Sequence, residues 1–120
     1  MKRTMKLNLL VIRTQNIELL KHQYELLGFK FNCHKHGNGP FHYASEMDGF
    51  VFEIYPLTKS MGKADSSIRL GFDIKELALR MQALKNSSWK IISDISMTEW
   101  GPKAILQDLD GRKVELKNIS

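Results

Sequence analysis

The chain has a single cysteine and no long run of apolar residues. Because Cys33 is alone, no disulfide can form within the chain, and one free thiol is typical of proteins in a reducing compartment. No apolar stretch approaches the ~20 residues that a membrane-spanning helix needs. The sequence also lacks low-complexity segments and linker-like stretches. We therefore expect a cytoplasmic protein with no membrane contact and a single domain over residues 1–120.

Blocks of like charge are absent as well, although the formal net charge is +5. Lysine and arginine never form a run longer than two residues, and no basic strand rich in aromatic residues resembles an RNA-binding motif. We therefore predict no nucleic-acid partner. Two interpretations of the positive charge remain open, a solvated basic surface and a site for an anionic small molecule.

The chain contains the same succession of predicted strands and helix twice. Each half predicts a strand, a helix and three further strands, at 6–13, 16–27, 29–34, 41–46 and 50–55, and then at 67–74, 75–85, 89–93, 103–108 and 113–117. The last two strands of each half flank an Asp-Gly turn. Gly49 and Gly111 lie 62 positions apart, and so do Glu53 and Glu115, which indicates a duplicated module.

The predicted fold class is therefore α+β, with two tandem βαβββ modules at about 6–57 and 67–117. Two such sheets set side by side form a curved mixed sheet around a cavity, where a ligand would bind. The helices are supported by apolar stripes at three- and four-residue spacing, which comprise Ile17, Leu20, Tyr24 and Leu27 in the first and Leu77, Met81 and Leu84 in the second. Gly28 supplies the left-handed stop that favours a helix end.

Each module places one carboxylate in the last strand of its hairpin. A two-residue turn at Asp48-Gly49 pairs Ala44 with Glu53, and alternation puts His42, Glu53 and Tyr55 on one face of the sheet. Glu115 shares its face with lysines, while its two neighbours point the other way. Strand pattern alone leaves two interpretations open, a solvent-facing glutamate and a glutamate directed into the cavity.

Several stretches resemble the vicinal oxygen chelate superfamily, which includes glyoxalase I, bleomycin-resistance proteins and ring-cleaving dioxygenases. The resemblance is carried by "ELLGF", "VFEIYPL", "IRLGFDI" and above all "WGPKAILQDLDGRKVEL", and it extends from about Lys6 to Leu116. It implies a glyoxalase-like fold, a small-molecule ligand and a homodimer. In members that use a metal, the ligands come from the first and last strands of each module.

The resemblance places Glu53 and Glu115 at the last-strand ligand positions, and Asn8 and Arg69 at the first-strand positions. Arginine has no lone pair to give a metal, and asparagine is a weak ligand for most transition metals. We therefore predict no cofactor. We expect Arg69 to pair with Glu115, with Glu53 or with both, either as a structural ion pair or as part of a ligand site.

Other side chains extend the candidate site. His34, His36 and His42 flank a glycine-rich turn and offer another route to a metal, in which His42 would join Glu53 and Glu115. Tyr55 and Trp100 are either aromatic walls of the pocket or core residues.

The functional prediction is a small-molecule-binding protein of the glyoxalase/bleomycin-resistance type. We expect it to be independent of metal and to bind a neutral or anionic ligand through Asn8, His42, Glu53, Tyr55 and Arg69, with Trp100 and Glu115. The alternative is a metal-dependent lyase, isomerase or dioxygenase that uses Glu53 and Glu115 with a non-standard further ligand. We make no prediction about which reaction, if any, is catalysed.

Overall fold

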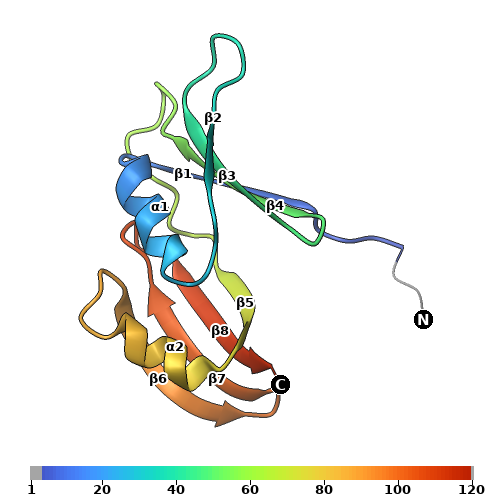
Figure 1. The fold of residues 1–120 in the computed structure, drawn as a ribbon. Helices are drawn as coiled ribbons and strands as arrows, with labels where there is room; N and C mark the ends of the chain where they lie inside the picture. Colours follow the sequence, from blue (N-terminus) through green and yellow to red (C-terminus); the bar gives the residue numbers. More distant parts are fainter. Residues whose placement is uncertain (1–3, 120) are drawn as a thin grey trace. The chain divides into compact units, whose positions relative to one another are not determined.

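A computed structural model describes residues 4–119, which divide between Ala64 and Asp65 into two compact units. The elements, in chain order (Figure 1), are β1 (Leu9–Thr14), α1 (Ile17–Glu25), β2 (Asn32–His34), β3 (His42–Met47), β4 (Phe50–Pro56), β5 (Leu70–Lys75), α2 (Leu77–Leu84), β6 (Lys90–Thr98), β7 (Gly101–Gln107) and β8 (Lys113–Ile119).

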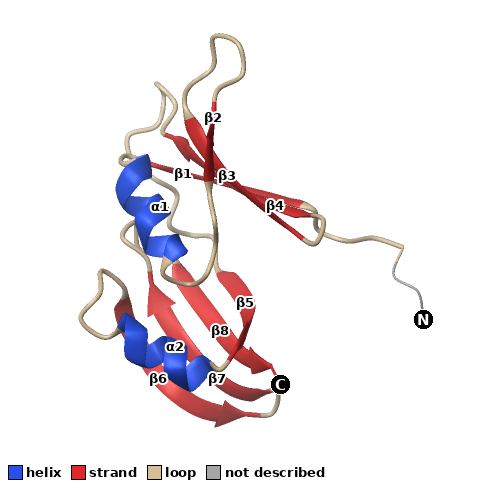
Figure 2. Cartoon of the chain, viewed as in Figure 1, coloured by secondary structure: helices blue, strands red, loops and turns tan. Residues whose placement is uncertain are grey.

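The two units have the same topology. The first holds a four-stranded sheet in the order β1-β4-β3-β2, and the second holds one in the order β5-β8-β7-β6. In each, the first strand runs parallel to the last, and the last two strands form an antiparallel hairpin. Each sheet has one helix inserted after its first strand (Figure 2). The predicted α+β fold of two βαβββ modules is therefore confirmed.

Helix α1 forms where its apolar stripe can be buried. Asn16 caps its start, because the Asn16 Oδ1 accepts a hydrogen bond from the Leu19 backbone N–H at 3.1 Å. Leu20 and Tyr24 are fully buried, and the Tyr24 ring meets the edge of Phe52 on β4 at 5.1 Å between centroids. Gly28 follows with φ of 116°, a positive value that only glycine adopts without strain. Burial of this stripe against β4 holds the helix to one face of the first sheet.

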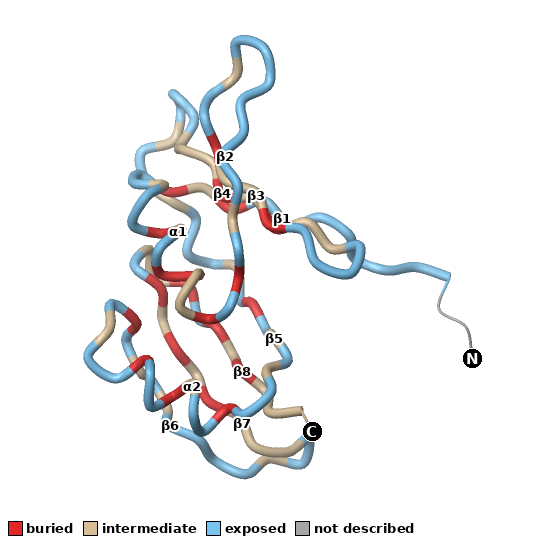
Figure 3. The backbone as a smooth tube through the Cα atoms, in the orientation of Figure 1, coloured by how far each residue is buried: buried red, intermediate tan, exposed pale blue. Residues whose placement is uncertain are grey.

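Helix α2 is anchored by the strand beside it. Its N-cap residue, Glu76, has a left-handed backbone and provides no side-chain cap. Instead, Asn118 on β8 accepts a hydrogen bond from the Leu77 N–H through its Oδ1, at 2.9 Å. Leu77 and Leu84 are buried, and Figure 3 shows buried segments along α2, β7 and β8. The helix therefore covers one face of the second sheet, as α1 does in the first.

The two hairpin turns differ in construction. Asp48 and Gly49 have φ of 51° and 79°, so they form the tight two-residue turn with two left-handed residues that suits a hairpin. The second turn is longer and is closed by Asp108, whose backbone N–H donates to the Arg112 carbonyl at 3.0 Å. Inside it, Arg112 Nη1 lies 3.1 Å from a carboxylate oxygen of Asp108 and 3.1 Å from one of Asp110. The second turn is thus built on buried charges, because the side chains of Arg112 and Asp108 are 1% and 0% exposed.

The predicted bounds were least accurate for β6, while β1, β2 and β5 each begin three residues later than predicted. We expected a strand at 89–93 followed by a turn region, whereas β6 continues to Thr98 and the turn is confined to Glu99 and Trp100. Its pairing with β7 shifts register between Ile91 and Ser93 and again between Ser93 and Ser96. Such bulges interrupt the alternation of apolar and polar residues. The alternation of apolar and polar residues therefore does not predict the part of β6 that follows Ser93.

No helix within residues 4–119 is long and apolar enough to cross a membrane.

Candidate functional site

The candidate residues that belong to strands, namely His42, Glu53, Tyr55 and Glu115, lie on the sheet face that each module's own helix leaves uncovered, which we call the open face. Alternation determines this face: Phe52 and Ile54 are fully buried toward α1, so Glu53 between them points the other way. In the second module Val114 and Leu116 are fully buried, and Glu115 points away from them. The observed register also pairs Ala44 with Glu53, as the two-residue turn predicts. In both modules the glutamate therefore points away from its apolar strand neighbours, as alternation predicts.

In the first module, Glu53 lies beside a buried histidine. The Glu53 Oε2 is 3.6 Å from His42 Nε2, and the side chains are 18% and 1% exposed. The His42 ring stacks on Tyr55 with 4.1 Å between centroids and an interplanar angle of 9°. His42 Nδ1 lies 3.3 Å from the Pro40 carbonyl oxygen. His42, Glu53 and Tyr55 therefore form one compact group, as the strand alternation predicted.

The histidines near this group are stacked rather than convergent. The His42 ring lies 5.8 Å from that of His34 and 5.2 Å from that of His36, and His34 and His36 are 6.0 Å apart with planes inclined by 21°. Imidazole lone pairs lie in the ring plane, so rings stacked in this way direct them along separate lines. Among residues 4–119 there is no group of three or more His, Cys, Asp or Glu side chains arranged to hold a metal ion. The arrangement does not fit the metal route through these histidines.

Tyr55 is covered on its other side by an arginine that the sequence analysis did not single out. The Arg13 guanidinium carbon lies 5.0 Å from the Tyr55 ring centroid, and Arg13 Nη1 donates to the Pro56 carbonyl at 2.9 Å. Arg13 pairs in register with Tyr55 across the parallel β1 and β4. A prediction of that register would have placed the two side chains on one face.

In the second module, Glu115 is held by two cations. Arg69 Nε donates to Oε2 at 2.6 Å, and Lys103 Nζ donates to Oε1 at 3.1 Å. The Lys103 hydrogen bond, with that of Arg69, lowers the pKa of Glu115 from its ordinary value of 4.5. The Glu115 side chain is 27% exposed and that of Arg69 is 54% exposed, so this is a surface-accessible cluster. Glu115 is one of the two partners that the sequence analysis left open for Arg69.

Trp100 belongs to the same cluster through Lys103. Its ring lies 5.1 Å from Lys103 Nζ, and the residue is 64% exposed. Such exposure excludes a role in the hydrophobic core, which was one of the two interpretations of this residue. Lys103 itself was missed, although alternation along β7 places it on the same face as Glu115 of the neighbouring strand.

A hollow of about 150 Å³ opens beside Glu115 and is lined by Gly71, Phe72, Asp73, Lys103, Glu115 and Lys117. Gly71 pairs in register with Glu115, and Asp73 pairs with Lys117. A Cβ atom built on Gly71 would meet no atom within 4 Å. The absent side chain therefore leaves this space free between the charged groups around it.

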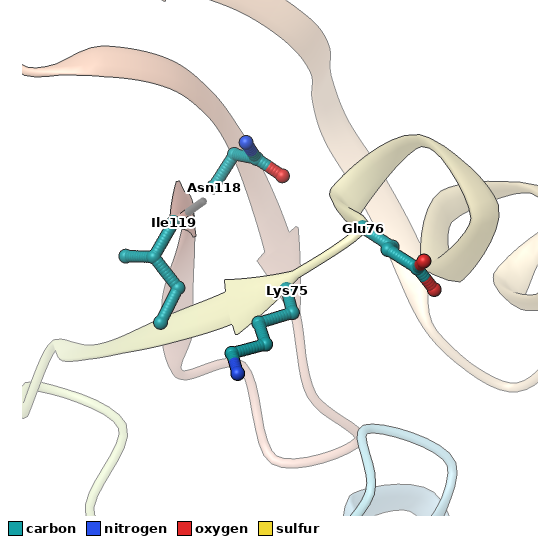
Figure 4. A pocket seen from close by; sticks show the side chains of 4 residues that line it. All are labelled: Lys75, Glu76, Asn118 and Ile119. Atoms are coloured by element: carbon teal, nitrogen blue, oxygen red, sulfur yellow. The ribbon is translucent and has the colours of Figure 1, made fainter.

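A larger hollow of about 570 Å³ lies where β5 ends and α2 begins, lined by Lys75, Glu76, Asn118 and Ile119. Figure 4 shows the charged ends of Lys75 and Glu76 directed away from each other. The Asn118 amide is already used to cap α2. With no converging polar groups, this hollow is a gap at a strand end rather than a recognition site.

Asn8 and Arg69 occupy equivalent places, one residue before β1 and one residue before β5. The Asn8 carbonyl accepts a hydrogen bond from the Val51 N–H at 2.8 Å, while its side chain is exposed. The structure thus groups His42, Glu53 and Tyr55 in one module and Arg69, Trp100 and Glu115 in the other. That the two groups line one cavity stays a prediction.

Comparison with known proteins identifies the fold. No protein-family model and no curated protein matches the chain. Among solved structures, the antibiotic-binding protein TnmS3 from Streptomyces sp. CB03234 is 18% identical, with a TM-score of 0.75 over 100% of both chains. A glyoxalase/bleomycin resistance protein/dioxygenase family enzyme from Burkholderia phytofirmans PsJN is 14% identical, with a TM-score of 0.73 over 94% of this chain and 98% of that one. The chain has the glyoxalase-like fold of the vicinal oxygen chelate proteins.

A glyoxalase-related enzyme from Fulvimarina pelagi has the same fold, with 16% identity and a TM-score of 0.70 over 95% of this chain and 88% of that one. The fold is therefore shared by proteins described as enzymes and by one described as an antibiotic binder. Because one fold hosts several chemistries, the function of this chain has to be argued from its side chains.

Proposed function

We propose that this protein binds a neutral or anionic small molecule on its open sheet faces and does so without a metal ion. The observation that carries the proposal is the Glu115 cluster, in which a guanidinium and an ammonium each hold one carboxylate oxygen. The cluster is exposed enough for a ligand to reach, with Trp100 beside it. An accessible group of cations and an aromatic ring suits a small acid or a neutral polar molecule.

The donor set around Glu115 does not fit a divalent metal. Two positive groups lie at the carboxylate that would have to bind the ion, and a metal would have to displace both against their repulsion. Arg69 brings no lone pair to this position. In the first module, Glu53 faces His42, whose ring is stacked on the rings of His34 and Tyr55. We therefore derive no metal-dependent step.

A direct test combines metal analysis with ligand screening. The protein purified without chelators should contain no stoichiometric transition metal, and its melting temperature should rise with small acids or neutral polar compounds but not with Zn²⁺ or Mn²⁺. Stoichiometric metal that stabilises the protein would favour instead the metal-dependent lyase, isomerase or dioxygenase, with Glu53, Glu115 and His42 as ligands.

Restoring metal ligands tests the assignment of the positions themselves. The double substitution Asn8→His and Arg69→His removes one of the two competing cations and supplies two imidazoles, so it should create micromolar Zn²⁺ or Co²⁺ binding that calorimetry detects. The matched control, Lys59→His with Lys113→His, adds two histidines at exposed positions and should bind no better than the natural protein. If the first double variant takes up no metal, these positions do not correspond to a metal site.

A homodimer and a cytoplasmic location remain predictions from the sequence. Sedimentation of the purified protein checks the first, and cell fractionation checks the second.

A further inference from the structure

We infer that the hollow above Gly71 binds the carboxylate of a small monoanionic acid, with Lys117 and Lys103 as its cationic contacts. The inference rests on the proposed small-molecule function and adds to it a place and a ligand class. The residues that line the hollow come from three adjacent strands of one sheet, β5, β8 and β7. The second module alone therefore positions every group that the argument uses.

The space exists because a glycine stands where a side chain would fill it. Gly71 lies inside β5 and does not have the positive φ that would require glycine. Glycine weakens a strand, both through chain entropy and through the lack of packing, so its presence marks either a bend or a close approach by another group. The open space above Gly71, with no atom within 4 Å of a built Cβ, leaves room for such a group.

The charges around the hollow leave one positive charge over. The hollow is lined by two lysines, Lys103 and Lys117, and by two carboxylates, Asp73 and Glu115. Arg69 does not line it, but its ion pair with Glu115 adds a third cation to the group. Within residues 4–119, Lys117 forms no ion pair shorter than 4.0 Å, although Asp73 is its partner in register. A monoanion makes the group neutral, whereas a cationic ligand adds to the excess.

Donors suited to a carboxylate are also in place. A lysine ammonium carries three N–H donors, and Lys103 gives one of them to Glu115 Oε1. The Lys117 ammonium contributes a second set at the same hollow. Trp100, whose ring lies against Lys103, is exposed and offers a surface to the apolar part of the acid. Benzoate, which combines a carboxylate with a small flat apolar body, is therefore a suitable probe.

The test is titration calorimetry of the full chain with benzoate, benzamide and benzylamine at low salt. These three ligands share a phenyl ring and a similar size, and they differ in charge. We expect benzoate to bind at least tenfold more tightly than benzamide, no heat from benzylamine, and weaker benzoate binding as salt increases. Equal affinities for benzoate and benzamide would show that the site does not select a carboxylate, and would overturn the inference.

Two substitutions locate the binding. Gly71→Ile should abolish measurable benzoate binding while the melting temperature stays the same or rises, because isoleucine fills the hollow and suits a strand. Lys117→Met should weaken benzoate at least tenfold and leave benzamide unchanged. The matched controls are Gly62→Ile, at another glycine with no atom within 4 Å, and Lys113→Met, which removes the same charge from the same strand outside the hollow. Both controls should bind as the natural protein does.

A third substitution should act in the opposite direction. Asp73→Asn removes the negative charge that lines the hollow, so benzoate binding should become tighter by about three- to tenfold. If Gly71→Ile and Lys117→Met bind benzoate normally, the acid binds elsewhere and the proposed small-molecule function survives. If no acid and no neutral compound binds the natural protein at all, the proposed function fails together with the inference.

Discussion

The two modules carry a glutamate at the same place in the same hairpin, yet they hold it with different chemistry. Glu53 lies beside His42, a fully buried ring that stacks on Tyr55. Glu115 lies between Arg69 and Lys103, of which Arg69 is more than half exposed. The comparison teaches that one position of a duplicated fold serves packing in one copy and accessible charge in the other.

The same contrast appears in the turns that connect the hairpin strands. The first turn needs only two left-handed residues, Asp48 and Gly49. The second contains Arg112, which is buried with its ion pairs to Asp108 and Asp110. A buried ion pair costs desolvation, and removing one partner leaves the other charge uncompensated. The second turn is therefore the more vulnerable of the two.

The largest effect is expected from breaking the buried turn. Arg112→Met should lower the free energy of unfolding by about 3–5 kcal/mol, because it leaves buried carboxylates without their cation. The counterpart in the first turn is Lys6→Met, which removes only an exposed hydrogen bond from Lys6 Nζ to the Asp48 carbonyl at 3.1 Å. That variant should change stability by less than about 0.5 kcal/mol. Urea unfolding measures both, and equal effects would contradict the contrast between the turns.

An intermediate effect is expected from removing the partners of the two glutamates. His42→Ala should cost about 2–3 kcal/mol, because it empties a buried site under Tyr55. Arg69→Ala should cost less than about 1 kcal/mol, because exposed ion pairs contribute little. His42→Phe keeps a ring in the stack and should lose less than His42→Ala. Urea unfolding of the three variants measures these losses. If Arg69→Ala lowers the free energy of unfolding as much as His42→Ala does, the two modules do not differ in the way described.

The smallest effect is expected on the melting temperature at acidic pH. The hydrogen bonds from Lys103 and Arg69 lower the pKa of Glu115 below 4.5, so its contribution to stability is complete above that value and is lost as the pH falls through the lowered pKa of the folded state. The natural protein should therefore lose melting temperature below pH 4.5 more steeply than Glu115→Gln does. The double variant Arg69→Met with Lys103→Met removes the cause of the shift and should behave like Glu115→Gln. If the melting temperatures of all three proteins fall in parallel as the pH is lowered, Lys103 and Arg69 are not the cause of the lowered Glu115 pKa.

Much of the fold was readable from the sequence because its signals are local. The Asp48-Gly49 turn determines the register of the first hairpin, and from that register follows the face on which Glu53 lies. The apolar stripe that ends at Gly28 predicted α1, and the constant offset between the halves predicted the second module. What failed was local as well: β6 continues to Thr98 because bulges break its alternation.

The sequence by itself determined two βαβββ modules and the open faces that carry Glu53 and Glu115, since turn chemistry and periodicity act over a few residues. Only the tertiary structure decided which side chains meet there. His42 is buried because rings from β2 and from β4 stack on it. Glu115 reaches Arg69 because β5, which is distant from β8 in the sequence, lies beside β8, and it reaches Lys103 across the hairpin of β7 and β8. Such encounters depend on which strands pair and in what register. No short stretch of the chain contains that information.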